Sequence, residues 1–155
     1  LMRASIARFK YRGRREYADF YAEELVKRCG ELLHSWQPDA LVPVPLHKSR
    51  MRKRGFNQAE LTARKVGKAL GIPVEKRLLL RTKKTSPQKE LNDVQRRANL
   101  KNAFQVSQND VRLKRVVLVD DIYTTGSTID AAAAVLLEHG VERVYFLTIC
   151  IGRGF

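Results

Sequence analysis

The chain has 155 residues, of which 44% are hydrophobic, and it carries a formal net charge of +14. This length suits one domain around one core, so residues 1–155 are predicted to form a single domain. The composition excludes a disordered polar tail, and no apolar run approaches the ~20 residues that a transmembrane helix needs.

The first predicted elements are a helix and a strand. Residues 16–36 place apolar side chains three to four positions apart, which predicts an amphipathic helix that ends before Pro38. Its apolar face is predicted to contain Tyr17, Phe20, Tyr21, Leu25, Cys29, Leu32 and Trp36. Residues 41–46 predict a short strand, although its two prolines cannot donate to a neighbour. Residues 47–55 follow as a basic loop.

A second helix and strand come next. Residues 57–70 predict a helix that Asn57 caps and Gly71 ends. Residues 74–80 predict another strand. The polar residues 81–99 form a long connection, and such connections in compact domains are usually lids or binding loops.

The last third of the chain continues the alternation. Residues 104–106 predict a short strand, and residues 115–119 predict a strand that is buried on both faces. Residues 128–139 are rich in alanine and predict a helix, and residues 144–149 predict a final buried strand. This order predicts an α/β fold with a mostly parallel sheet flanked by helices.

The most informative segment runs from Val116 to Thr128. An apolar strand delivers Asp120 and Asp121 to its carboxyl end, which is where ligands bind in open α/β sheets. The loop that follows contains Thr124, Thr125, Gly126, Ser127 and Thr128. Backbone N–H groups at a helix start hold anions, and carboxylates accept hydrogen bonds from vicinal hydroxyls. The segment therefore predicts a site for ribose 5-phosphate.

An acidic pair at a strand end could instead bind a metal ion, as in phosphoacceptor receiver domains. The threonines would then only cap the helix. The run of four hydroxyl side chains around one glycine favours the sugar phosphate.

The positive charge is concentrated in the middle of the chain. Residues 47–101 contain 17 basic and 4 acidic side chains, whereas the rest of the chain is nearly neutral. Such a field attracts pyrophosphate or nucleic acid, although a solvated surface would have the same composition. Phe56 is the one aromatic residue in this range, and platforms that stack single-stranded DNA usually contain more.

The sulfur and imidazole side chains predict no zinc site. Cys29 and Cys150 lie far apart, and His34, His47 and His139 lack the spacing of zinc ligands. Isolated thiols and the lack of a visible signal peptide favour a cytoplasmic protein without membrane insertion.

Further motifs accompany the segment from Val116 to Thr128. They are Lys10-Tyr11-x-Gly13, Val42-Pro43-Val44-Pro45, Arg54-Gly55-Phe56-Asn57-Gln58-Ala59, Thr85-x-x-Gln88, Arg96-x-x-Asn99 and Ala103-Phe104. With them, almost the whole chain resembles the ComF competence-protein family within the type I phosphoribosyltransferases, which bind phosphoribosyl pyrophosphate (PRPP). Many members carry a four-cysteine zinc module before this region, and its cysteines are absent here, so we expect no zinc.

The resemblance implies a role for each matching residue. Asp120 and Asp121 would hold the ribose hydroxyls at the reacting centre as the catalytic pair, and residues 124–128 would hold the 5-phosphate. The implied pyrophosphate contacts are Leu46, His47, Lys48, Arg52 and Arg54. A mobile loop, residues 81–99, would close over the site with contacts from Lys83, Lys84 and Gln88. Mg²⁺ would arrive with PRPP, held largely by phosphate and sugar oxygens.

Two functions remain open from the sequence. The first is a PRPP-binding protein of the ComF type that acts in DNA uptake during natural transformation, alongside other competence proteins. Single-stranded DNA would then lie on Arg50, Arg52 and Lys53. The second is an active phosphoribosyltransferase that transfers ribose 5-phosphate to an unidentified nitrogen acceptor. No residues identify a base-recognition pocket, which weighs against ordinary nucleobase salvage.

Overall fold

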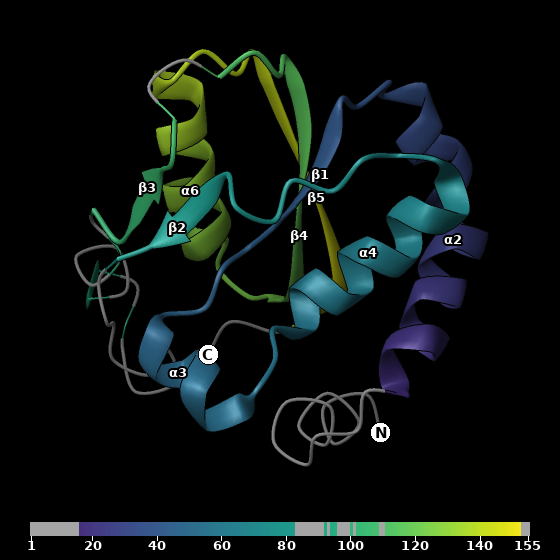
Figure 1. Ribbon diagram of the computed structural model, residues 1–155, viewed down its shortest axis with the longest axis horizontal. Helices are drawn as coiled ribbons and strands as arrows, with labels where there is room; N and C mark the ends of the chain where they lie inside the picture. The colour runs from purple at the N-terminus through teal and green to yellow at the C-terminus, as the bar shows by residue number, and fades with distance from the viewer. Residues whose placement is uncertain are drawn as a thin grey trace.

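The computed structural model describes residues 16–82, 92, 94–95, 100, 102–108 and 111–152 (Figure 1). Its elements are α2 (Tyr17–Ser35), β1 (Ala40–Pro43), α3 (Lys48–Arg54), α4 (Gln58–Leu70), β2 (Leu79–Arg81), β3 (Phe104–Val106), β4 (Arg115–Tyr123), α6 (Ser127–Glu138) and β5 (Arg143–Ile151). Among the described residues, no helix is both long enough and apolar enough to cross a bilayer.

The central sheet has three parallel strands in the order β1-β4-β5. Ala40 pairs with Val116 on one side of β4, and Arg115 pairs with Arg143 on the other. Because the strands are parallel, their carboxyl ends meet at one edge of the sheet. The predicted α/β fold with a parallel sheet is confirmed.

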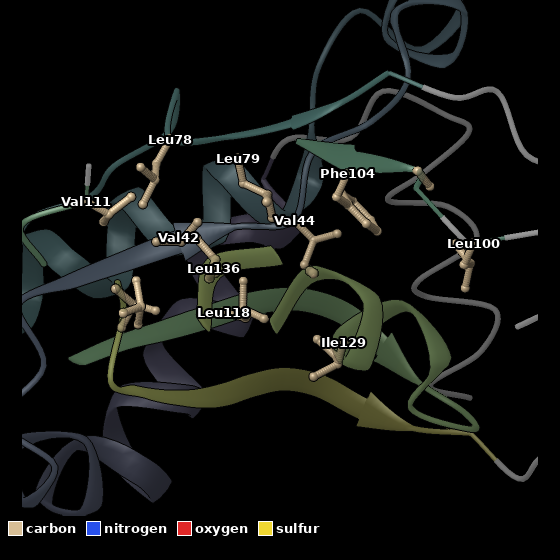
Figure 2. Close-up of a cluster of buried hydrophobic side chains, with 14 residues drawn as sticks. Val42, Val44, Leu78, Leu79, Leu100, Phe104, Val111, Leu118, Ile129 and Leu136 are labelled. Carbon is tan, nitrogen blue, oxygen red and sulfur yellow. The ribbon is translucent and has the colours of Figure 1, made fainter. Parts of the chain in front are cut away.

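Alternating residues of β4 face two different layers. Val116 and Leu118 pack with Leu136 of α6 and with the β2–β3 pair, in the cluster that Figure 2 shows. Val117 and Val119 pack instead with residues of α2 and α4. In Figure 1, α6 and the β2–β3 pair accordingly lie on one side of the sheet, and α2 and α4 lie on the other. Burial on both faces explains why β4 is an almost unbroken apolar run.

The helix predicted for residues 16–36 is confirmed, but its buried face is rotated from the predicted one. Tyr21, Leu25 and Leu33 are buried, whereas Phe20 and Leu32 are 55% and 52% exposed. Trp36, just after the helix, stacks on Tyr145 of β5 with ring centroids 4.5 Å apart. The small residues Ala18, Ala22 and Gly30 complete the buried face, which lets α4 pack closely against α2.

The prediction of a loop over residues 47–55 is wrong, since most of this segment is the helix α3. The ring of His47 caps it by accepting a hydrogen bond from the backbone N–H of Ser49 (3.2 Å). Gly55 ends it with a left-handed φ of 77°. The segment has no apolar periodicity, so only its caps carried a local signal.

Two predicted strands also differ from the structure. Within residues 74–80, Val74 makes only an isolated bridge to Leu41, and β2 pairs antiparallel with β3 outside the central sheet. β5 lies at the edge of the sheet and is not a fully buried strand. Leu147 is its one buried residue, and Phe146 is 43% exposed.

Candidate functional site

The two adjacent carboxylates lie inside β4, near the carboxyl edge of the sheet. Asp120 is half-buried, and one of its oxygens accepts a hydrogen bond from the backbone N–H of Asp121 (2.8 Å). Asp121 is only 5% exposed, and its Oδ1 accepts from the N–H of Ile122 (2.9 Å). Each carboxylate is therefore oriented by the peptide group that follows it, and a carboxylate has about four acceptor positions in all.

The two carboxylates have partners on different layers. Asp121 accepts a hydrogen bond from Nε2 of Gln58, at the start of α4 (3.0 Å). Asp120 interacts electrostatically with Arg81, at the end of β2. The predicted pair is therefore hydrogen-bonded to α4 on one side of the sheet and interacts electrostatically with β2 on the other.

The loop after β4 forms a hollow that ends at the first turn of α6. Residues 122–129 line it, and it opens to solvent. Within the hollow, the hydroxyls of Thr125 and Ser127 lie 2.8 Å apart. Gly126, at the start of α6, has no side chain that could cap the helix, and the N–H of Ser127 makes only a long hydrogen bond to Oγ1 of Thr125 (3.5 Å). A helix start of this kind favours a negatively charged group.

Gly126 makes the hollow possible for two reasons. Its φ of 83° is left-handed, which other residues rarely adopt. A Cβ atom at this position would also lie 2.6 Å from the hydroxyl oxygen of Tyr123. The ring of Tyr123 is itself stacked on Phe146, with centroids 5.0 Å apart.

Helix α3 brings the predicted pyrophosphate contacts to the same edge. It starts just beyond β1, whose end is joined to β4 by a hydrogen bond from the N–H of Val44 to the carbonyl of Val119 (2.9 Å). Five of its seven residues are basic, and none is buried. Lys48, Arg52 and Arg54 therefore lie on one short helix, with Leu46 and His47 immediately before it. Lys83, Lys84 and Gln88 lie outside the described residues.

Arg81 is a functional candidate that the sequence analysis missed. Its guanidinium lies 5.2 Å from the ring centroid of Phe104, its partner across the β2–β3 pair. Burial lowers the pKa of Arg81 to about 10, and the charge of Arg50 acts in the same direction, while Asp120 opposes both. Arg81 thus interacts electrostatically with a cation, Arg50, and with a carboxylate, Asp120, and a partly buried positive charge of this kind suits an anionic ligand. The sequence could not indicate this interaction with Asp120, because Arg81 is one of many basic residues in a polar segment.

Arg54 was expected to contact pyrophosphate, but its hydrogen bond to Gln58 was not predicted from the sequence. Nη1 of Arg54 donates to Oε1 of Gln58 (3.2 Å), and Gln58 in turn donates to Asp121. Asn57 caps α4 through the N–H of Ala59 and also donates to the carbonyl of Val44 (3.0 Å). The Arg-Gly-Phe-Asn-Gln motif marked this segment in the sequence. It did not show that Gln58 contacts Asp121 of β4, which lies more than 60 positions later in the chain.

Within the part of the chain that the structure describes, no three His, Cys, Asp or Glu side chains gather as metal ligands. The acidic pair of β4 is therefore not part of a larger cage of protein ligands there. A divalent ion at this edge would need oxygens from a bound ligand.

Comparisons with known proteins identify the family to which the chain belongs. A family model described as "Phosphoribosyl transferase domain" matches residues 23–154. "Competence protein F" of Haemophilus influenzae is 43% identical over 109 residues, which are 69% of this chain and 48% of that protein. "Competence protein ComFC" of Bacillus subtilis is 32% identical over 143 residues, 90% of this chain and 55% of that protein. The chain spans about half the length of these curated relatives.

A third relative and two solved structures complete the comparison. "DNA utilization protein YhgH" of Escherichia coli K12 is 37% identical over 113 residues, 73% of this chain and 49% of that protein. The purine phosphoribosyltransferase of Pyrococcus horikoshii matches with a TM-score of 0.50 and 15% identity, over 88% of this chain and 83% of that one. A hypoxanthine phosphoribosyltransferase of Staphylococcus aureus also gives 0.50, at 14% identity, over 91% of this chain and 74% of that one. At these identities the two structures show the fold alone.

The family match covers most of the chain, and the relatives with competence names are more than 30% identical to it over much of its length. The resemblance to ComF proteins expected from the sequence is confirmed, and the chain belongs to the phosphoribosyl transferase domain family.

Proposed function

We propose that the chain binds PRPP, or its ribose 5-phosphate part, at the carboxyl end of β4 and acts in DNA uptake as a ComF-type protein. The hollow beside the two strand-end carboxylates is the observation that carries the proposal. The names of the relatives, competence protein F and DNA utilization protein, support the link to DNA. We place this role in the cytoplasm, with other competence proteins as partners.

The sugar phosphate would contact both the loop at the start of α6 and the carboxylate pair of β4. N–H groups of the first α6 turn, with the hydroxyls of residues 124–128, would donate to the 5-phosphate. Asp120 and Asp121 would accept hydrogen bonds from the ribose hydroxyls. The oxygens of Asp121 already hold Gln58 and Ile122, but a carboxylate has about four acceptor positions, so a hydroxyl can be added.

The pyrophosphate of PRPP would lie toward α3. Lys48, Arg52 and Arg54 supply positive charge there, and Arg81 adds a partly desolvated cation from β2. A Mg²⁺ ion would be held mainly by phosphate and sugar oxygens, with Asp120 as a candidate ligand from the protein. Its charge would offset that of the pyrophosphate.

A calorimetric titration with PRPP, with and without Mg²⁺, tests the proposal. We expect saturable binding to the wild-type chain, and about tenfold weaker binding to the Asp120→Asn variant, because a hydrogen bond to a charged group is lost. Asp19→Asn, on the exposed surface of α2, serves as the matched control. Equal affinity of the Asp120 variant and the control would contradict the proposed site.

The exposed face of α3 supports binding of single-stranded DNA. Arg52 and Lys53 are exposed, and α3 contains no acidic residue that would repel phosphates. Reversing the charges of Arg50, Arg52 and Lys53 should abolish a salt-dependent complex with an oligonucleotide, measured by fluorescence anisotropy. The control reverses three exposed charges elsewhere, Lys27, Lys68 and Arg112. If both triple variants bind alike, DNA does not lie on α3.

An active phosphoribosyltransferase is the alternative, and the partly buried cation of Arg81, which interacts electrostatically with Asp120, favours it. Negative charge develops on the pyrophosphate as it leaves C1, and Arg81, with Arg50 in its electrostatic surroundings, would stabilise that charge. Release of pyrophosphate from PRPP, assayed against a panel of amines and bases, tests this function. Release with one acceptor would establish turnover, and binding of PRPP without release would favour the binding role.

A further inference from the structure

Gln58 lies between two charged side chains, and both ends of its amide group form hydrogen bonds with them. Its Nε2 donates to Oδ2 of Asp121 (3.0 Å), and its Oε1 accepts from Nη1 of Arg54 (3.2 Å). Gln58 is 3% exposed and Asp121 is 5% exposed, so the hydrogen bond between them is shielded from water, and the one from Arg54 is partly shielded. Shielding strengthens them and makes their loss costly.

The polarity of these neighbours fixes the orientation of the amide. A guanidinium can only donate hydrogen bonds, and a carboxylate can only accept them. A flipped amide would place its NH₂ group against Arg54 and its oxygen against Asp121, so both contacts would become repulsive. Arg54 and Asp121 therefore determine the orientation of the Gln58 amide together.

The backbone around Gln58 is also anchored. Asn57 caps the first turn of α4 and donates to the carbonyl of Val44, at the end of β1. Asp121 is held from its other side by the N–H of Ile122 (2.9 Å). The amide and the carboxylate thus meet at a place that α3, α4 and β4 determine together.

We propose that Gln58 is a positioning residue for Asp121, and that Arg54 orients Gln58, so that the Arg54–Gln58–Asp121 chain links basic helix α3 to the ribose-binding carboxylate. The proposal rests on the proposed ribose site. It gives the Arg-Gly-Phe-Asn-Gln motif a physical role. It also predicts that an anion bound to Arg54 changes the position of the Asp121 carboxylate through Gln58.

Gln58→Glu distinguishes positioning from simple packing, because it preserves the shape of the side chain. Two facing carboxylates cannot both stay ionised without cost, so the pair retains a proton to a higher pH than either group alone. The substituted side chain, when protonated, can donate to Asp121 as glutamine does, whereas its ionised form repels Asp121. Loss of packing alone would give no such dependence on pH.

The first measurement is the affinity for ribose 5-phosphate at pH 5.5 and pH 8. We expect Gln58→Glu to bind about tenfold more weakly than the wild type at pH 8, and the deficit to shrink at pH 5.5. Taking the ratio to the wild type at each pH removes the titration of the ligand's own phosphate. Gln105→Glu, the same change at an exposed position of β3, should match the wild type at both values. A Gln58→Glu variant that also matches the wild type at both values would overturn the proposal and leave the ribose site intact.

The second measurement needs no ligand. In NMR spectra, the side-chain NH₂ of Gln58 should exchange slowly with water in the wild type, and faster in Arg54→Met, which removes the donor that orients it. Arg54→Lys, which keeps a donor, should restore part of the protection. Unchanged exchange in Arg54→Met would refute the chain. If the wild type fails to bind ribose 5-phosphate, the proposed function fails, and this measurement still decides whether Arg54 orients Gln58.

Discussion

At the scale of single residues, Gly126 is a position in the loop where an added side chain would meet both backbone strain and a close contact. Alanine there would have to adopt a left-handed φ and would also press on the ring of Tyr123. The stack of Tyr123 on Phe146 limits how far this ring can move away. The glycine therefore keeps the floor of the hollow open.

We expect Gly126→Ala to lower the free energy of unfolding by ~1–3 kcal/mol and the affinity for ribose 5-phosphate by about tenfold. Urea denaturation and calorimetry measure the two effects. Gly71→Ala is the matched control, because Gly71 also has a left-handed φ (69°) but has nothing within 4 Å of a new Cβ. It should lose stability and keep its affinity. Equal affinities of the two variants would show that the hollow tolerates a methyl group.

The residue-scale roles differ in how far the sequence indicated them. Asp120, Asp121 and the loop of residues 124–128 follow one another in the chain, so a local pattern was enough to predict that they share a site. Arg81 and Gln58 were missed, because their importance comes from contacts with distant side chains. Neither residue differs locally from an ordinary surface arginine or an ordinary helix-start glutamine.

At the scale of elements, the boundaries of α4 depend on its caps. Asn57 and Gly71 flank the helix as predicted, and Asn57 has a second contact that the sequence did not show, with the carbonyl of Val44. This contact joins α4 to the end of β1. It explains why the start of α4 lies beside the carboxyl edge of the sheet.

Asn57→Ala should therefore lower the free energy of unfolding by ~2 kcal/mol, which is more than the loss expected from removing a helix cap alone. Asn57→Ser keeps an oxygen that can cap the helix but is too short to reach Val44, so it should lose about half as much. Chemical denaturation of both variants separates the two contributions. Equal losses would mean that the bond to Val44 contributes nothing measurable.

Helix α3 shows where element-scale prediction fails. Its seven residues are polar or basic apart from Met51, so no apolar period distinguishes a helix from a loop. The ring of His47 and the left-handed Gly55 define its ends. β2 and β3 were predicted as strands, but their antiparallel pairing outside the main sheet depends on packing against α6.

At the scale of the whole molecule, Asp39 joins segments that are far apart in the sequence. Its Oδ2 accepts hydrogen bonds from the backbone N–H groups of Lys114 (2.8 Å) and Arg115 (2.9 Å). Its own N–H donates to the carbonyl of Arg115 (2.8 Å). Asp39 thereby sets the register at which β1 enters the sheet beside β4.

The hydrogen bonds from Arg115 and then Lys114 lower the pKa of Asp39 below the usual aspartate value of 3.8. A lowered pKa means that the ionised carboxylate stabilises the fold above pH 3.8, and that this contribution disappears as the pH falls through the lower, folded-state value. Asp39→Asn should cost ~1 kcal/mol or less at pH 7, because the site is exposed, and its deficit should vanish in strong acid. Thermal unfolding from pH 7 to pH 2.5 measures this, with exposed Glu75→Gln as the control. If the stability difference between Asp39→Asn and the wild type does not change with pH, the charge of Asp39 does not contribute to stability.

The sequence by itself determined the α/β class, the strand that carries Asp120 and Asp121, the loop after it and the ends of α4. These features are encoded within a few neighbouring residues, through apolar periodicity, capping side chains and glycine. The tertiary structure decided the helical form of α3, the edge position of β5 and the contacts of Arg54, Gln58 and Arg81. It did so because packing around the sheet brings together side chains that are far apart along the chain, such as Gln58 and Asp121, and no local pattern records which of them will meet.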